Sequence, residues 1–168
     1  MAWNKGDYVV HRRDGICRIT DIAELNLSKD GPRMYYILTP LYETGSRLYT
    51  PFEQGDQQLR DPLKAEEIED LISMIPGFGS DWIGDEKERQ RHLTEIVRNG
   101  SHESLLKAIH TLYEKRREQA QAGRKFHASD ERFLGEAEKS VNREFAFVLG
   151  MAPEDIPEYI RSRLEKGR

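Results

Sequence analysis

The sequence predicts an α+β protein: a small N-terminal antiparallel β-module, a Tudor-like curled sheet, followed by a C-terminal all-α helical bundle. Short β-branched and aromatic runs alternate with glycine-containing turns in the first fifty residues. Beyond them, apolar residues recur at helical spacing. A hydrophobic content of 37% gives a modest core for 168 residues, which favours two small modules. We place the boundary at Asp61, giving domains 1–60 and 61–168.

Four strands are expected in the β-module. The first is Tyr8-Val9-Val10, and Asp14-Gly15 then predicts a tight hairpin, because glycine adopts the positive φ that such a turn needs. The second strand is expected at 16–22, directly after this turn. The third and fourth follow turns at 29–32 and 43–46, and are expected at 34–39 and 47–50.

The last of these strands is expected at an edge of the sheet. Alternation places Arg47 and Tyr49 on one face and Leu48 and Thr50 on the other. An unpaired edge is a natural docking place for a partner strand. The alternative is that Arg47 and Tyr49 are ordinary solvated strand residues.

The helical half is divided by capping and stop residues. Asp61-Pro62 is expected to start a helix, and Pro76-Gly77 to end it before a loop that carries Phe78 and Trp82. A second helix is expected from Asp85 to Asn99, with Asn99-Gly100 as a left-handed stop. Further starts are expected at Ser101, at Ser129-Asp130-Glu131 and at Pro153.

Composition limits the function classes. The net charge of −4 excludes a generally basic nucleic-acid protein, so any DNA contact must come from a local cluster or from a partner's help. The single cysteine, Cys17, excludes an intrachain disulfide and is expected to be a small buried hydrophobe. Neither a signal peptide nor a membrane-spanning run is recognisable, so we expect a cytoplasmic protein.

No catalytic constellation can be found in the sequence. The five histidines lack zinc spacing, and neither a Gly-x-Ser-x-Gly elbow nor a phosphate-cradling loop is present. We therefore expect no enzyme activity, no cofactor, no metal and no small-molecule ligand.

An ordered set of motifs carries a family resemblance. It consists of Gly6-Asp7-x-Val9-Val10, Gly15, Ile16-x-x-Ile19 and Leu48-Tyr49-x-Pro51. This set resembles the CarD family of bacterial transcription regulators, and the module is also similar to the polymerase-interacting domain of transcription-repair coupling factor. The resemblance implies docking on the β subunit of bacterial RNA polymerase by sheet extension. We expect Arg47, Tyr49 and Pro51 at the contact; family members often carry a basic residue at the place of Tyr49.

The resemblance also implies a DNA contact by the helical half. Trp82 matches in place the tryptophan that CarD-type regulators use as a wedge at the upstream edge of the promoter bubble. Many members have basic residues directly after it, whereas here residues 83–86 intervene. The alternative is that Trp82 covers the helical core as a lid. Basic candidates for phosphate contacts are Arg89, Arg91, Arg124, Lys125 and Arg132.

The function implied is stabilisation of the open promoter complex by a polymerase-bound, nucleoid-associated regulator whose DNA binding is weak and not sequence-specific. The alternative is a polymerase-bound adaptor whose helices bind another protein and not DNA. The acidic balance and the residues inserted after Trp82 favour this second reading.

Overall fold

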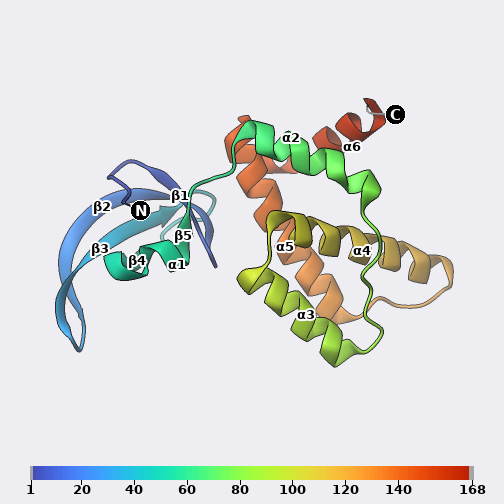
Figure 1. The fold of residues 1–168 in the computed structure, drawn as a ribbon, viewed down its shortest axis with the longest axis horizontal. Helices are drawn as coiled ribbons and strands as arrows, with labels where there is room; N and C mark the ends of the chain where they lie inside the picture. Colours follow the sequence, from blue (N-terminus) through green and yellow to red (C-terminus); the bar gives the residue numbers. More distant parts are fainter. Residues whose placement is uncertain (1, 167–168) are drawn as a thin grey trace. The chain divides into compact units, whose positions relative to one another are not determined.

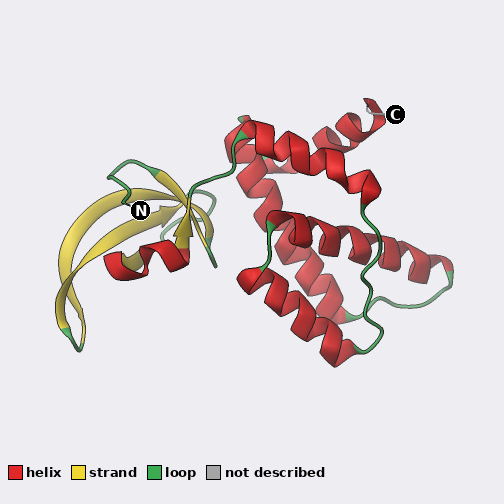
Figure 2. Ribbon diagram, viewed as in Figure 1, coloured by secondary structure: helices red, strands yellow, loops and turns green. Residues whose placement is uncertain are grey.

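The computed structural model describes residues 2–166, which divide into two compact units, one ending at Leu63 and one beginning at Lys64. The first is a five-stranded antiparallel sheet and the second is helical (Figures 1 and 2). The predicted fold class is confirmed. The assignment of a separate function to each unit remains a prediction.

The sheet has the strand order β4-β3-β2-β1-β5. Its strands are β1 (Tyr8–His11), β2 (Gly15–Ser28), β3 (Gly31–Pro40), β4 (Leu48–Pro51) and β5 (Leu59–Arg60). β2 and β3 are longer than expected and form a curved hairpin (Figure 1). Register shifts between Ile19 and Asp21 and between Leu25 and Ser28 account for the curvature, because a bulge bends the strand that carries it.

The predicted hairpin at Gly15 is confirmed, and the residue has a φ of 76°. A short 3-10 turn, η1 (Phe52–Gln54), and the one-turn helix α1 (Gly55–Gln58) follow β4. They lead into β5, a strand that the sequence analysis did not foresee. The core beneath the sheet contains the buried Trp3, Val9, Cys17, Ile19, Tyr36, Leu38 and Leu59. The expectation that Cys17 is a buried hydrophobe is thus confirmed.

The helical unit is built around α5 (Ala128–Leu149), which contacts α2 (Ala65–Met74), α3 (Glu86–Asn99), α4 (His102–Gln121) and α6 (Ile156–Lys166). The 3-10 turns η2 (Ile75–Gly77) and η3 (Pro153–Asp155) follow α2 and precede α6. Apolar stripes from the helices meet in the core. Its most buried side chains include Ile68, Ile72, Leu112, Leu134, Phe145 and Ile156.

Two predicted caps are confirmed, whereas two predicted helix starts and one predicted stop conformation are wrong. Asp85 and Ser101 accept backbone N–H groups at the starts of α3 and α4. The first helix starts at Ala65 rather than at Asp61, whose carboxylate binds Trp3 instead. α5 starts at Ala128, so Ser129 lies inside it. α3 ends at Asn99 as predicted, but Gly100 has an extended conformation with a φ of −77° rather than a left-handed one.

Candidate functional site

Strand β4 is an end strand of the sheet, as predicted from the sequence. Among the strands that the structure describes, it pairs with β3 alone, and Tyr36 lies opposite Thr50 and Ile37 opposite Tyr49. Tyr49 is 45% exposed whereas Thr50 is completely buried, so the predicted alternation of faces is confirmed for these two residues. Arg47 is exposed and directly precedes the strand, while Pro51 ends it and is half-buried.

The core holds this edge in place from behind. The ring of Tyr36 stacks on Phe52 with centroids 4.3 Å apart, and Trp3 packs edge-on against Tyr36 at 5.9 Å. A further side chain next to these rings would be crowded, because a Cβ added to Gly55 would lie 3.3 Å from Tyr36. The edge therefore offers backbone groups that no described strand pairs with, together with the exposed ring of Tyr49 and the cation of Arg47, on a firmly packed support.

Trp82 lies in residues 78–85, a stretch without helix or strand that joins η2 to α3. The preceding residue, Asp81, ties this stretch to two helices. Its Oδ1 accepts a hydrogen bond from the hydroxyl of Thr111 on α4 at 2.8 Å, and its Oδ2 lies 3.4 Å from Nε2 of His92 on α3. The backbone next to Trp82 is thereby attached to the helical core.

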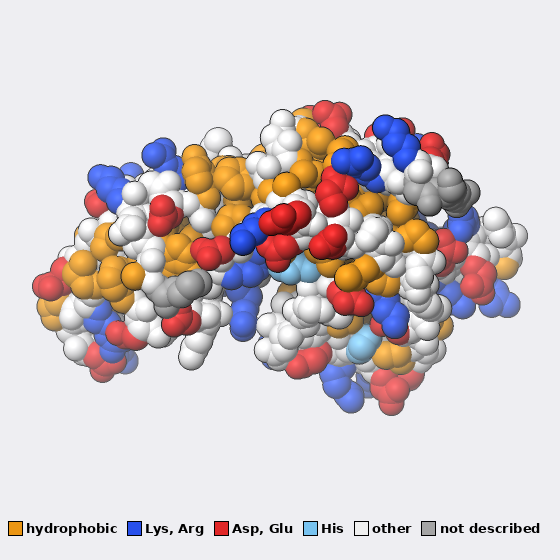
Figure 3. All heavy atoms as spheres, turned by 45° about the horizontal axis from the view of Figure 1, so that its top comes forward, with side chains coloured by type: hydrophobic (Ala, Val, Ile, Leu, Met, Phe, Trp, Pro, Cys, Tyr) orange, Lys and Arg blue, Asp and Glu red, His pale blue; other side chains and the backbone are white. Residues whose placement is uncertain are grey.

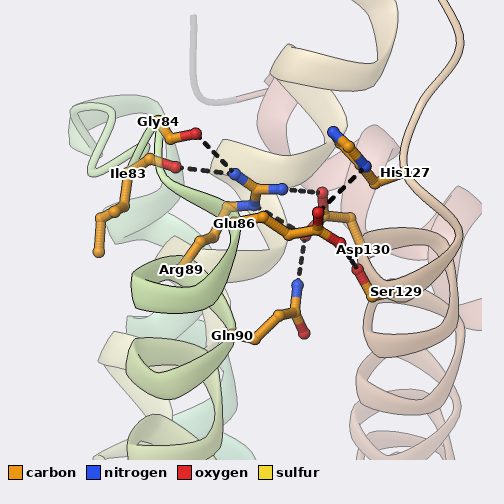
Figure 4. A network of polar contacts seen from close by, with 8 residues as sticks. All are labelled: Ile83, Gly84, Glu86, Arg89, Gln90, His127, Ser129 and Asp130. Atoms are coloured by element: carbon orange, nitrogen blue, oxygen red, sulfur yellow. Dashed lines mark hydrogen bonds and ion pairs between the residues drawn. The ribbon is translucent and has the colours of Figure 1, made fainter.

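Arg89 holds the other side of the Trp82 segment (Figure 4). Its Nη1 donates to the carbonyl oxygens of Ile83 and Gly84 at 2.9 and 3.3 Å. Its Nε and Nη2 donate to the two carboxylate oxygens of Asp130 at 2.9 and 2.8 Å. The Arg89 and Asp130 side chains are 3% and 0% exposed, so this bidentate ion pair is removed from solvent.

The indole ring of Trp82 receives two cations. The guanidinium carbon of Arg89 lies 4.2 Å from the ring centroid, and Nζ of Lys115 lies 5.1 Å from it. Such arrangements attract a cation to the negative face of the ring. Lys115 also pairs with Glu118 at 3.2 Å, and this pair is much more exposed than the Arg89 pair.

Trp82 is half-buried and borders two hollows. One, shared with Arg89 and Leu93, has a volume of about 10 Å³ and cannot hold a ligand. The other is an open groove of about 440 Å³ between residues 78–82 and α4. Besides Trp82, its lining includes Phe78, His110, Glu114, Lys115 and Glu118. Trp82 therefore packs on the helical core while part of it stays accessible from this groove.

The predicted basic residues differ in accessibility. Arg91, Arg124, Lys125 and Arg132 are exposed, on α3, on the connection before α5 and on α5 itself. Arg89 is buried, and Asp130 and two backbone carbonyls occupy its guanidinium. Because no face of this group is free for a phosphate, we leave Arg89 out of the proposed DNA contact. On the face drawn in Figure 3, Lys and Arg side chains are interspersed with Asp and Glu.

Sequence reasoning did not single out Asp130, Gln90 or Lys115 as parts of this site. Asp130 looked like an acid at a helix start, yet its carboxylate binds Arg89 and also accepts from Nε2 of Gln90 at 2.8 Å. A pairing across 41 residues leaves no trace in spacing or periodicity. The only local hint was that Asp130 is an acid next to Ser129, the residue predicted from the sequence to cap this helix.

The described residues contain no metal-binding cluster and no activated thiol. Among residues 2–166, no group of three or more His, Cys, Asp or Glu side chains could hold a metal ion. Burial raises the pKa of Cys17 to about 12, which makes the thiol a poor nucleophile at neutral pH. Burial also raises the pKa of the Glu138 carboxyl. None of the helices in this part of the chain is long and apolar enough to cross a membrane.

Comparison with known proteins identifies the N-terminal unit. Residues 3–62 match the family described as CarD-like/TRCF RID domain. These residues cover all five strands of the sheet. The resemblance noted from the sequence is thus confirmed for this unit, and the matched family is an interaction domain rather than a catalytic one. A search among curated proteins found none that matches the chain.

Proposed function

We propose, on the premise that residues 3–62 form a CarD-like/TRCF RID domain, that this chain is a transcription regulator that binds bacterial RNA polymerase through its β subunit. The domain match carries this proposal, because domains of this family interact with RNA polymerase. The free edge of β4 is the proposed contact, with Arg47, Tyr49 and Pro51 around the backbone groups that a polymerase strand would pair with.

The helical unit, in this proposal, contacts promoter DNA at the upstream edge of the bubble. Trp82 fills the gap beside a distorted base step, and the exposed Arg91, Arg124, Lys125 and Arg132 meet phosphates. With so few cations on a chain of net charge −4, affinity for free DNA is weak. Tethering to polymerase offsets this weakness, because it supplies a high local concentration of the module near the duplex.

A regulator that binds opened DNA better than closed DNA shifts the equilibrium by that difference in affinity alone. A coupling of about 1–3 kcal/mol lengthens the lifetime of the open complex roughly 5–150-fold if it acts wholly on bubble collapse. The contact is not sequence-specific, since phosphates and a wedge carry little information about base identity. In this proposal the protein is cytoplasmic, and it associates with the nucleoid because it binds RNA polymerase.

Open-complex decay tests this function. Purified polymerase and promoter DNA are mixed with the chain, and the surviving complexes are counted over time after a heparin challenge. The wild-type chain should lengthen the lifetime, and Trp82→Ala should abolish the gain while still co-eluting with core polymerase. A Trp82→Ala variant as effective as wild type would refute the wedge.

The second candidate function is an adaptor whose helical unit binds another protein. The burial of Arg89 and the carboxylates of Glu114 and Glu118 in the groove favour it, because both reduce the positive charge offered near Trp82. A footprint of the polymerase–promoter complex separates the two functions. Protection that does not change upstream of the bubble when the chain is added supports the adaptor.

A further inference from the structure

We infer that Asp130 is a positioning residue for Trp82, acting through Arg89, so that the ion pair between α3 and α5 sets the place of the tryptophan before any partner binds. This inference rests on the proposed contact of Trp82 with DNA. It adds Asp130, an acidic residue on α5, as the residue that holds the ring in place through Arg89.

Each part of the Arg89 guanidinium has a separate partner. One edge is used by the two oxygens of Asp130, and Nη1 is used by the carbonyls of Ile83 and Gly84. The group also lies over the ring of Trp82, 4.2 Å from its centroid. The same planar group thus fixes the ring and the two residues that follow it, which a point charge such as lysine could not do.

Asp130 determines where that plane lies. A bidentate carboxylate fixes both the direction and the rotation of a guanidinium, whereas a single hydrogen bond leaves it free to turn. Gln90 donates to Oδ1 of Asp130 at 2.8 Å and so holds the carboxylate in turn. Because Asp130 is fully buried, water does not compete for these bonds.

A second connection between the same helices lies at the surface. Ser129 donates to Oε1 of Glu86 at 3.2 Å, and Nδ1 of His127 lies 3.7 Å from Oε2 of Glu86 (Figure 4). The first turns of α3 and α5 are therefore joined by a buried ion pair, Arg89 with Asp130, and by the surface contacts of Glu86. The Trp82 segment leads directly into this joint, since α3 begins at Glu86.

A ring that is already held loses little freedom when it inserts beside a base step. Ordering a mobile side chain and its loop on binding lowers affinity, and a preorganised group avoids that loss. Removing the ion pair should therefore weaken the action of Trp82 without altering its chemistry.

The test replaces the pair by apolar residues of similar size, Arg89→Met with Asp130→Leu. Such exchanges of a buried ion pair are often tolerated by the fold, whereas removing one partner strands a charge. The full chain is labelled with 5-fluorotryptophan, and the ¹⁹F resonances of Trp82 and Trp3 are assigned with Trp82→Phe. The Trp82 resonance should move towards that of free 5-fluorotryptophan, with a larger shift on exchange into D₂O, while Trp3 stays in place.

A matched control is available on the neighbouring helices. Arg116 on α4 pairs with Glu131 on α5 at 2.7 Å and lies 5.0 Å from the ring centroid of Tyr113. This pair also joins an arginine to a carboxylate across two helices, but through one hydrogen bond, and it is partly exposed. Arg116→Met with Glu131→Leu should leave the Trp82 resonance unchanged. An equal displacement in both double variants would overturn the specific role of Asp130.

A circular dichroism melt shows whether the double variant keeps its helical fold. If it does not, Arg89→Lys decides, because it keeps a cation beside Asp130 but cannot also reach the two carbonyls. A Trp82 resonance unmoved in a folded variant overturns the inference. The decay assay is separate: the double variant should lengthen the lifetime less than wild type does, and adding Trp82→Ala should cost the double variant less than it costs the wild-type chain. Should Trp82→Ala alone have no effect, the proposed function fails while the fluorine measurement still decides the positioning.

Discussion

The indole N–H of Trp3 donates to Oδ1 of Asp61 at 2.7 Å, joining residues 58 positions apart. Trp3 is buried and packs against Tyr36, so this bond ties the last residues of the N-terminal unit to its core. It also gives the reason why Asp61 is not a helix cap. Its carboxylate is used by the sheet unit, and α2 begins only at Ala65.

Loss of this bond should destabilise the N-terminal unit. We expect Asp61→Ala to lower its free energy of unfolding by about 1 kcal/mol, because Asp61 is exposed and water partly replaces it as the acceptor. Urea unfolding followed by Trp3 fluorescence, with Trp82→Phe as background, measures the change. Glu24→Ala, at an exposed site on β2, is the control and should leave the midpoint where it was.

The edge strand carries a buried hydroxyl that lacks a hydrogen-bond partner among the described residues, that of Thr50. Thr50 is completely buried opposite Tyr36. Replacing it by valine keeps the shape and removes the desolvated hydroxyl, so Thr50→Val should stabilise the unit by about 1 kcal/mol. The same fluorescence assay applies. Thr39→Val should bring no gain, because the Thr39 hydroxyl faces that of Thr20 at 3.4 Å.

His11 should make the β1–β2 turn sensitive to acid. Its Nδ1 accepts the N–H groups of Arg13 and Asp14, both at 3.2 Å, which requires the neutral ring. Burial lowers the pKa of His11 from 6.5, and the nearby Asp14 offsets part of this effect. The folded state then binds fewer protons than the unfolded chain. The contribution of neutral His11 to the free energy of unfolding is complete above pH 6.5, and it is lost as the pH falls towards the lowered pKa.

Urea midpoints measured between about pH 7.5 and 5.5 test this dependence; each unit by which the pKa is lowered corresponds to about 1.4 kcal/mol. The variant His11→Gln removes the titrating group and should flatten the part of the profile that His11 causes. Identical pH profiles for wild type and His11→Gln would contradict the role of this residue.

Cys17 should be unreactive while the sheet is folded. It is completely buried, and its pKa is raised to about 12, so very little thiolate exists at pH 8. We expect mass spectrometry to find no iodoacetamide adduct after an hour in buffer and complete alkylation in 8 M urea, by the ordinary reactivity of an exposed thiol. Alkylation at equal rates in both solutions would show that the core of the unit opens readily.

The polymerase contact should depend on the charge of Arg47. A carboxylate beside the free edge of β4 would face the same partner as the present cation, so Arg47→Glu should reduce recovery of the polymerase β subunit in a pull-down. The control is Arg18→Glu, at an exposed position on the interior strand β2. This variant should recover as much polymerase β subunit as the wild-type chain does. Undiminished recovery with Arg47→Glu would place the docking surface elsewhere.

Much of the fold could be predicted because local chemistry and tertiary structure agree. Asp14-Gly15 forms the expected turn, Tyr49 and Thr50 face opposite sides of an end strand, and Asp85 and Ser101 cap their helices. In each case the residue acts on its immediate neighbours. Such interactions are visible in a few consecutive letters of sequence.

The rest depends on residues distant in the chain. Gly100 is needed for space and not for its φ, since an added Cβ would lie 2.5 Å from the carbonyl oxygen of Ile96. The extent of β2 and β3 comes from their mutual pairing, which continues through polar residues that look like a loop. Likewise, Arg89 is buried, although nothing in the sequence of its highly charged helix indicates that a basic residue there would be buried.

The shortness of β4 limits the number of backbone hydrogen bonds that it can form with a partner strand. Four residues ending in a proline, which has no N–H to donate, support only a brief ladder with any visiting strand. Two copies of this protein would consequently gain little by pairing their β4 strands, whereas long, flat, exposed edge strands tend to associate into fibres. A partner strand that binds here must therefore gain most of its selectivity from side-chain contacts. Contacts with Tyr49, rather than backbone hydrogen bonds, would distinguish one partner from another.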